Sequence, residues 1–569
     1  MRAFLSNRRL FAALFTAILS IHFASFGADA PIDFKQWSLL AIQDGGRRKP
    51  LDTFAKETMM RMTGKSSIET DGRVWKPDEF VLSMLLNTHD WTKEPIILID
   101  YKPLVARLNL DLARKRFSID ELAGAPDLES LVRDAHDARQ GEKELSRMQK
   151  EAESVGSRFS LFNTLQTGSL LLIAPPPANP NARWLLPTEI ADHYSEAHAG
   201  EAMGFLRGLA SAYVAGDAFN FSLDASQLRA ALRALSPAIY PSDTSLKIEY
   251  FYNHLDPFLW AMVFYALALV ALSIANKSKT AGSARFLGLA CAGTGMLFHA
   301  GGIALRCTIA HRPPVTNMFE SVVWVSFGVM VFGFAFWARY RTLTYLVAAL
   351  PASLICLLLL RQLPVAMPEN IDPLVPVLRS NFWLTIHVLT ITLSYAAFLL
   401  AMAFGHIVLF RFIRDPRNTP EDALLHFWLY RVLQLGVLLL ACGTILGGVW
   451  ANYSWGRFWG WDPKETWALI ALLCYLVVLH GRLVGWWDHF GLAVSSVICF
   501  NAVLMTWYGV NFVLGKGLHS YGFGIGGESY VVAFVTLDLA YVALACVRNA
   551  RNRPPAAALF AAEERFQDA

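Results

Sequence analysis

The residues best suited to chemistry are concentrated in one aromatic stretch, WANYSWGRFWGWDPKETW, at positions 450–467. Its five tryptophans are Trp450, Trp455, Trp459, Trp461 and Trp467. An interfacial aromatic belt explains one or two indoles near a membrane surface, but not five with Gly456 and Gly460 between them. Glycine lets the backbone approach a flat ligand closely, and indoles stack on such a ligand. The stretch therefore predicts a site for a large planar cofactor.

The end of this stretch predicts the start of a helix. Asp462 can cap a helix with its carboxylate, and Pro463 fits the first helical turn. The tryptophans that precede Asp462 are then expected in a loop at one end of an apolar helix.

Four histidines are candidates for holding such a cofactor. His387 and His519 lie near the ends of apolar segments and bracket the aromatic stretch in the sequence. His480 and His299 lie within apolar segments, where an imidazole is costly and usually functional or paired. A lone histidine near a membrane interface more often makes local hydrogen bonds, so both roles stay open for these residues at this point.

The elements that carry these residues form a bipartite chain. Of its 569 residues, 54% are hydrophobic and only 17% are charged, which excludes a disordered protein, a nucleic-acid binder and an ordinary soluble enzyme. Of the 46 acidic residues, 31 lie between Ala30 and Asp256. The predicted fold class is therefore mainly α: a polytopic helical membrane protein of nine or ten spans that follows an N-terminal mixed α/β domain at 29–256.

The N-terminus sets the predicted orientation. Arg2, Arg8 and Arg9 precede an apolar run, so residues 1–28 are interpreted as a signal sequence or a retained signal anchor. Either form places residues 29–256 outside the cytoplasm. All seven cysteines follow position 256 and none forms a CxxC pair, so the chain is not expected to exchange disulfides itself.

Nine apolar spans are predicted within a membrane domain at 257–547, and a cytoplasmic tail at 548–569. The spans are 257–275, 284–304, 319–338, 343–361, 382–410, 427–449, 466–484, 490–511 and 529–547. In this topology the inside loops hold 14 basic residues and the outside loops hold seven, as the positive-inside rule requires. His387, His519 and the aromatic stretch then lie together at the outer face.

Local patterns give the expected elements of the N-terminal domain. Residues 104–117 and 130–156 are predicted helical, and residues 169–173 are predicted to form a strand. Residues 43–54 are predicted to form a loop that leads into a helix at 54–62. No catalytic triad, metal-ligand spacing or phosphate loop is predicted in this domain.

Three segments resemble one family. The stretch WGRFWGWDPKETW resembles the tryptophan-rich WWD signature of the cytochrome c assembly membrane proteins, of CcsA/ResC type and related to CcmC and CcmF. RSNFWLTIH at 379–387 and GKGLHSYGF at 515–523 resemble two further segments of that branch, and RPPVTNMFES at 312–321 resembles its early loop. The resemblance covers about residues 256–547.

The resemblance implies a set of haem-binding residues. His387 and His519 would be the axial iron ligands of an outer site, and His480 with His299 would ligate haem at an inner, entry-side site. His22 competes with His299 for that role if the N-terminal segment is retained. Trp455, Trp459, Trp461, Asp462 and Trp467 belong to the haem-binding loop. Arg457, Lys464 and Arg379 would either pair with haem propionates or act as interfacial anchors.

The resemblance also implies a function. The chain would deliver haem, as a transported b-type substrate, and attach it to apocytochrome c at a CxxCH segment, as a haem lyase or part of one, in the cytoplasmic membrane. Haem delivery to a separate synthase is the alternative, and transport of an unrelated solute is a third, disfavoured by the few midplane polar residues. A thiol reductant system and a CcsB/ResB-type membrane partner are the implied partners.

Overall fold

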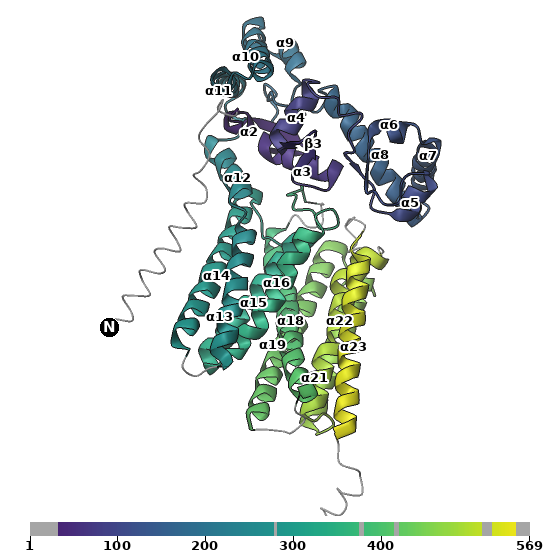
Figure 1. The fold of residues 1–569 in the computed structure, drawn as a ribbon, viewed down its shortest axis with the longest axis vertical. Helices are drawn as coiled ribbons and strands as arrows, with labels where there is room; N and C mark the ends of the chain where they lie inside the picture. Colours follow the sequence, from purple (N-terminus) through teal and green to yellow (C-terminus); the bar gives the residue numbers. More distant parts are fainter. Residues whose placement is uncertain (1–31, 278–280, 375–379, 415–419, 515–525, 553–569) are drawn as a thin grey trace, which may run out of the picture.

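The computed structural model describes residues 32–277, 281–374, 380–414, 420–514 and 526–552. An N-terminal domain sits on one end of a bundle of long helices (Figure 1). Each part has its own hydrophobic core: one is built from residues between Trp37 and Leu246, the other from residues between Tyr252 and Ala545. The predicted mainly helical fold with a small N-terminal α/β region is confirmed.

The strands of the N-terminal domain form three separate antiparallel pairs. They are β1 (Ala41–Asp44) with β2 (Arg47–Pro50), β3 (Ile68–Thr70) with β4 (Arg73–Trp75), and β5 (Ile97–Leu98) with β6 (Arg116–Phe117). The first pair is joined by Gly45 and Gly46, both at positive φ, a conformation that glycine adopts without strain. Residues 43–50, predicted as loop, are therefore a hairpin.

The N-terminal domain also contains twelve helical segments among its described residues. They are α2 (Lys35–Ser38), α3 (Leu51–Thr63), α4 (Pro77–Leu85), α5 (Lys102–Arg107), α6 (Ile119–Ala123), α7 (Pro126–Gln140), α8 (Arg147–Gln166), η1 (Pro187–Glu189), α9 (Ile190–His193), α10 (Glu196–Ala215), α11 (Ala218–Leu235) and α12 (Asp243–Leu255). The helix predicted at 54–62 is confirmed as the main part of α3.

Three other local predictions for this domain were wrong in part or whole. The helix predicted at 104–117 ends at Arg107, because Asn109 takes a left-handed conformation and the chain turns back to pair β6 with β5. The helix predicted at 130–156 is two helices, since Ser146 and Gln149 form a capping box that starts α8. Residues 169–173 are not a strand; the nearest pairing is one bridge between Ala174 and Leu185.

Nine helices in the described part of the chain are long and apolar enough to cross a membrane. The elements that form them, with α13 continuing from α12, are α13 (Pro257–Lys277), α14 (Gly282–Ala310), α15 (Met318–Tyr340), α16 (Thr344–Gln362), α17 (Asn381–Trp383) with η3 (Leu384–Val388) and α18 (Leu389–Arg414), α19 (Pro420–Trp455), α20 (Pro463–Leu483), α21 (His489–Ile498) with α22 (Phe500–Leu504) and η4 (Met505–Leu514), and α23 (Glu528–Asn552). Each overlaps one predicted span, so the multi-pass prediction is confirmed.

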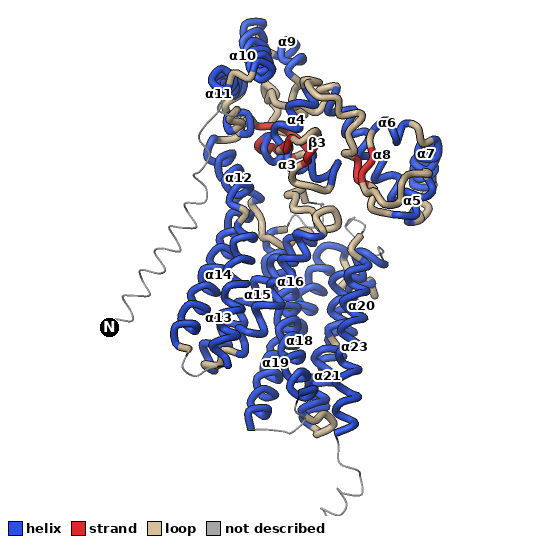
Figure 2. The backbone as a smooth tube through the Cα atoms, viewed as in Figure 1, coloured by secondary structure: helices blue, strands red, loops and turns tan. Residues whose placement is uncertain are grey.

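The helices run up and down beneath the N-terminal domain (Figure 2). Helix α13 leaves the domain at Asp256, α14 returns, and α15 starts at the domain end of the bundle. By the same alternation α18 and α20 start at this end and α19 finishes there. Residues 315–321, 384–388 and 450–465 are thus brought to the same end of the bundle as the N-terminal domain.

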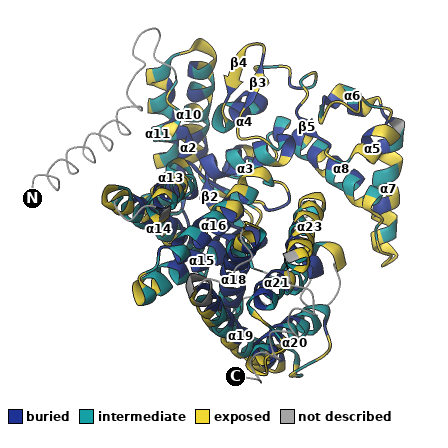
Figure 3. Cartoon of the chain, turned by 60° about the horizontal axis from the view of Figure 1, so that its bottom comes forward, coloured by how far each residue is buried: buried dark blue, intermediate teal, exposed yellow. Residues whose placement is uncertain are grey.

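Helix α18 lies in the middle of the bundle and is its most buried span. It packs against α15, α16, α19, α21 and α23, and Figure 3 shows buried residues concentrated around it. Within the described part of the bundle, the segments η3 and η4 are π-helical instead of α-helical. π-Helical turns are rare in proteins, and many of those that occur lie at functional sites.

Several predicted features lie outside the described residues. They are the signal segment at 1–28 with His22, Arg379, the segment 515–525 with His519, and most of the tail at 548–569. The domain boundaries drawn from the sequence stay a prediction.

Candidate functional site

A cavity opens between the domain-facing ends of five bundle segments. Its volume is about 150 Å³. The start of α15, η3 and the first turns of α18, the end of α19, the start of α20, and η4 provide its lining. Ligand pockets commonly measure about 300–1,000 Å³, so this smaller cavity has room for one edge of a large ligand.

His387 lies on the π-helical turn η3 and lines this cavity. Its Nδ1 is 2.9 Å from the backbone carbonyl oxygen of Gly443 on α19. A carbonyl only accepts, so Nδ1 carries the proton and the lone pair of the neutral ring is on Nε2. The ring also packs edge-on against Trp450, with centroids 5.5 Å apart.

Two glycines near the end of α19 make room for this arrangement. A Cβ atom on Gly447 would lie 2.7 Å from Cε1 of His387, and one on Gly448 would lie 2.6 Å from the Phe458 ring. Both contacts are closer than side chains tolerate, so glycine is required for the rings to lie against the helix. The consecutive glycines in an apolar span were a signal for this site that the sequence prediction did not use.

Trp459 is the tryptophan of the predicted haem-binding loop that lines the cavity. Its ring meets that of Trp461 edge-on at 6.0 Å, while Trp461 is 69% exposed and outside the lining. Trp455 ends α19 and Trp467 lies in α20; both are partly buried and neither lines the cavity. The loop therefore presents its indoles in different directions rather than as one stack.

The predicted cap of α20 is confirmed. Asp462 is 5% exposed and accepts a hydrogen bond from the backbone N–H of Lys464 at 3.0 Å. Glu465 accepts from the N–H groups of Asp462 and Gly460 at 3.2 and 2.8 Å. These bonds fold the Trp459–Trp461 turn back onto the helix start, so Asp462 fixes the loop and does not face the cavity.

The cations near the loop have different surroundings. Lys464 lines the cavity, and its Nζ donates to Oδ1 of Asn511 at 3.0 Å. Arg457 does not line the cavity and is 3.8 Å from Glu465. Asn511 in turn donates from Nδ2 to the backbone oxygen of Trp507 at 2.8 Å.

Segment η4 supplies residues that the sequence prediction missed. Trp507 and Asn511 both line the cavity from this π-helical segment, and the Trp507 indole N–H donates to the Ser321 hydroxyl at 3.0 Å. An asparagine in an apolar span, four residues after a tryptophan, is a signal that sequence reasoning could have used.

His299 and His480 are not brought together with the cavity or with each other. His299 is fully buried on α14, with its Nδ1 3.3 Å from the Tyr265 hydroxyl and its Nε2 3.1 Å from the Val323 carbonyl oxygen. His480 lies near the far end of α20, with Nδ1 2.8 Å from the carbonyl oxygen of Leu476. Helices α14 and α20 lie on opposite sides of the bundle (Figure 2), so their predicted pairing is not supported by this arrangement.

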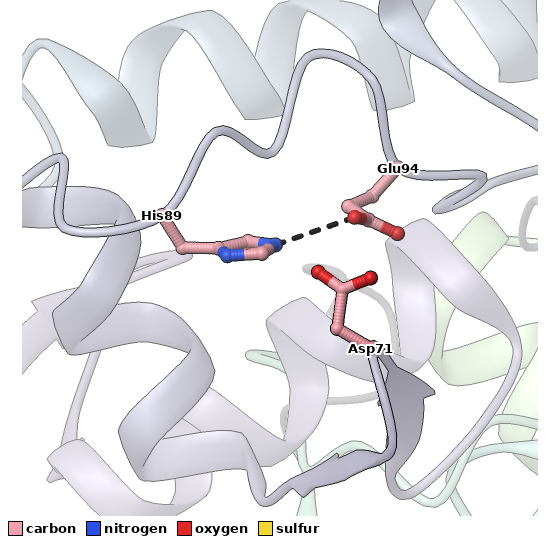
Figure 4. A group of neighbouring side chains, drawn as sticks. All are labelled: Asp71, His89 and Glu94. Atoms are coloured by element: carbon pink, nitrogen blue, oxygen red, sulfur yellow. Dashed lines mark ion pairs between the residues drawn. The ribbon is translucent and has the colours of Figure 1, made fainter.

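One group of metal-type ligands occurs elsewhere among the described residues. Asp71, His89 and Glu94 converge in the N-terminal domain (Figure 4), with ligand atoms within 4.8 Å of one another. His89 Nε2 and Glu94 Oε1 are 3.4 Å apart, an ion-pair distance. His89 and Glu94 lie on the loop between α4 and β5, and Asp71 lies at the turn between β3 and β4, so the group is separate from the cavity.

The fold and this cavity define a polytopic helical membrane protein with a histidine-containing, tryptophan-lined site at one end of its bundle. A family model described as cytochrome C assembly protein matches residues 315–519, the segment that supplies the lining of this cavity.

Individual relatives extend this match. Protein NrfI of Wolinella succinogenes is 31% identical over 513 residues, which cover 84% of this chain and 53% of NrfI. The cytochrome c biogenesis proteins CcsA of Guillardia theta and of Prochlorococcus marinus (strain NATL1A) are 35% and 34% identical, over 76% and 92% of their own lengths and 37% and 45% of this chain. The chain thus spans about half the length of NrfI and most of either CcsA protein.

The chain belongs to the cytochrome c assembly protein family. Its predicted role in cytochrome c biogenesis and its multi-pass membrane character are thereby confirmed. The roles of the individual site residues stay predictions.

Proposed function

We propose that this protein binds haem at the cavity through His387 and presents it to apocytochrome c for covalent attachment. The hydrogen bond between His387 and the Gly443 carbonyl carries this proposal. Histidines that ligate metals usually donate their other ring N–H to such a partner, which fixes the tautomer and makes the ligating nitrogen more basic. Nε2 of His387 is thereby prepared to bind haem iron.

The lining of the cavity matches the chemistry of a haem edge. Trp450, Trp459 and Trp507 offer aromatic and apolar surface, and Lys464 offers a cation. Charge-assisted hydrogen bonding would pair Lys464 with a haem propionate. Among the three cations predicted to do so, Lys464 is the one that lines the cavity in the described part of the chain.

His519 is the proposed second iron ligand. In the sequence, its segment begins directly after η4, which lines the cavity up to Asn511, and ends two residues short of α23. Two imidazoles would complete the axial coordination of the iron and would hold it until the histidine of a CxxCH segment replaces one of them.

The attachment step needs positioning more than acid–base chemistry. Each thiol of the CxxCH segment adds across a haem vinyl group: sulfur bonds to one vinyl carbon and the thiol hydrogen passes to the other, so the step is redox-neutral. The protein would contribute by holding haem and peptide in register. A thiol reductant system would keep the two cysteines reduced.

The proposed site is at the outer face of the cytoplasmic membrane. The N-terminal domain and the cavity lie at the same end of the bundle, and the excess of basic residues predicted for the inside loops belongs to the other end. His480 lies near that other end, about 25 Å along α20 from Pro463 at 1.5 Å per residue. Haem entry near His480 is therefore compatible with delivery to His387 from the opposite side.

Haem content and spectrum of the purified protein test this proposal. We expect a six-coordinate low-spin spectrum in the native protein, loss of that spectrum in His387→Gly, and partial recovery when imidazole fills the vacated space. His311→Gly is the matched control, because His311 is exposed and has a φ of 53°, which glycine adopts without strain. An unchanged low-spin spectrum in His387→Gly would refute the ligand assignment.

A further inference from the structure

A buried ion pair lies between α14 and α15, next to the cavity. Arg306 Nε and Glu320 Oε1 are 2.8 Å apart, and each side chain is 1% exposed. Charges removed from solvent in this way are stable only when their other donors and acceptors are also satisfied. The remaining partners of the pair therefore show what it holds in place.

Glu320 holds the turn that enters α15. Its Oε2 accepts from the backbone N–H and from the hydroxyl of Thr316, at 2.8 and 2.6 Å. Its own backbone N–H donates to the side chain of Asn317, the N-cap of α15, at 2.8 Å. Thr316 and Asn317 line the cavity that contains His387, so this carboxylate fixes one wall of the proposed haem site.

Arg306 ties this wall to the connection that follows α16. Its Nη1 donates to the backbone oxygen of Glu369 at 2.8 Å, and its Nη2 donates to that of Asn370 at 2.9 Å. The Asn317 side chain donates to the same Asn370 oxygen at 3.0 Å. Arg306 and Asn317 therefore both hold the connection after α16 against the Thr316–Asn317 wall.

Glu369 continues the chain of contacts into the N-terminal domain. Its carboxylate accepts from Nζ of Lys56 on α3 at 3.2 Å and from the hydroxyl of Tyr252 on α12 at 3.1 Å. Burial raises the pKa of the Glu369 carboxyl, but the nearby charges of Lys56 and Arg306 outweigh this effect and hold that pKa below its usual range. The carboxyl is thus ionised at neutral pH, as these contacts require.

The N-terminal domain and the bundle are not tightly packed where these hydrogen bonds and ion pairs join them. Lys56, Tyr252, Arg306, Glu369 and Asn370 line a second cavity of about 540 Å³ between the N-terminal domain and the bundle. Three charged residues of this lining, Lys56, Glu369 and Arg306, together with Glu320, which pairs with Arg306, are here called the interdomain relay; Lys56 pairs with the Glu369 carboxylate, and Arg306 donates to the Glu369 backbone oxygen.

We propose that the interdomain relay is a set of positioning residues through which the seated N-terminal domain holds the Thr316–Asn317 wall against bound haem. This inference rests on the proposed haem site. Lys56 lies in the N-terminal domain and outside the lining of the His387 cavity. Loss of its ion pair with Glu369 then loosens the wall without removing any haem contact.

Ligand exchange at the iron measures this effect in the full-length, haem-loaded protein. We expect Lys56→Met to retain haem but to exchange its axial histidine for added cyanide faster by about two- to thirtyfold, the range of couplings carried by such networks. Lys56→Arg should restore the native rate. Lys115→Met is the matched control, since Lys115 pairs with Asp100 in the same domain outside the relay.

Amide hydrogen exchange of residues 315–321 provides a second measurement that does not depend on haem. Protection there should fall in Lys56→Met and stay native in Lys115→Met. Unchanged protection in Lys56→Met, or equal loss in both variants, would overturn the relay. Cyanide exchange that is indifferent to His387→Gly would instead count against the proposed haem site, so the two failures are distinguishable.

Discussion

Lys464 provides the sharpest test of ligand chemistry at the scale of single residues. It is the one lysine or arginine in the described lining of the cavity. If it pairs with a propionate, Lys464→Gln should weaken haem binding by about ten- to a hundredfold, as expected for a charged hydrogen bond of about 1.5–3 kcal/mol. Haem dimethyl ester, which carries no carboxylate, should bind equally to both proteins in spectroscopic titrations.

Arg457→Gln is the control for this titration, because Arg457 lies beside Glu465 and outside the lining. An equal loss of affinity for haem and for its dimethyl ester in Lys464→Gln would show that the lysine supports the fold of the site instead.

The tryptophans of the loop should differ in importance. Trp459 lines the cavity, whereas Trp461 is 69% exposed. Trp459→Ala should lower haem affinity by about 1–3 kcal/mol, the range for loss of an aromatic stacking platform, and Trp461→Ala should lower it less. Haem content after purification measures both. A larger loss in Trp461→Ala would contradict this description of the site.

The sequence predicted individual side chains of the site but not the residues on other helices that contact them. Residue type and the family resemblance identified His387 and Trp459. The Gly443 carbonyl that fixes the His387 tautomer, and the Asn511 that accepts from Lys464, belong to other helices. Only the packing of α18 and α20 against those helices brings them together, and no local pattern encodes it.

A contact between His406 on α18 and Asp538 on α23 joins two spans of the bundle. His406 Nε2 and Asp538 Oδ1 are 2.7 Å apart; the Asp538 side chain is 3% exposed and the His406 side chain 31%. Helix α23 is the least buried of the nine candidate spans, and Tyr541 on it also donates to the His406 backbone oxygen at 3.0 Å. These two contacts therefore hold α23, the helix that follows the His519 segment, against α18.

Removal of one partner should cost more than removal of both. His406→Leu leaves the Asp538 carboxylate unpaired in an apolar setting and should lower the free energy of unfolding in detergent by about 3 kcal/mol. The double variant His406→Leu, Asp538→Leu should recover most of this loss. Equal destabilisation of the single and double variants would show that the ion pair is not what holds α23.

The apolar spans could be predicted because about twenty consecutive apolar residues signal a membrane helix without knowledge of its neighbours. The π-helical segments η3 and η4 could not, since α and π turns have the same composition and differ through packing. The β1–β2 and β3–β4 hairpins had usable signals in Gly45–Gly46 and in Asp71–Gly72, whereas the two-residue strands β5 and β6 had none.

The whole molecule has its N-terminal domain and cavity at one end of the bundle and His480 at the other. Reporter fusions in the full chain at Trp459 and at Arg414, the last residue of α18, should therefore score on opposite sides of the membrane. Trp459 should score outside. Same-side results would contradict the proposed path of haem from the inner to the outer face.

Covalent cytochrome c formation tests the central claim most directly. The protein would be expressed with an apocytochrome c in a host that lacks its own attachment system, and covalent haem would be measured by haem staining after denaturing electrophoresis. The account predicts covalent cytochrome with the native protein, none with His387→Gly, and partial recovery of that variant in imidazole. A native protein that loads haem yet forms no covalent cytochrome, or a His387→Gly variant that forms it in full, would contradict the account.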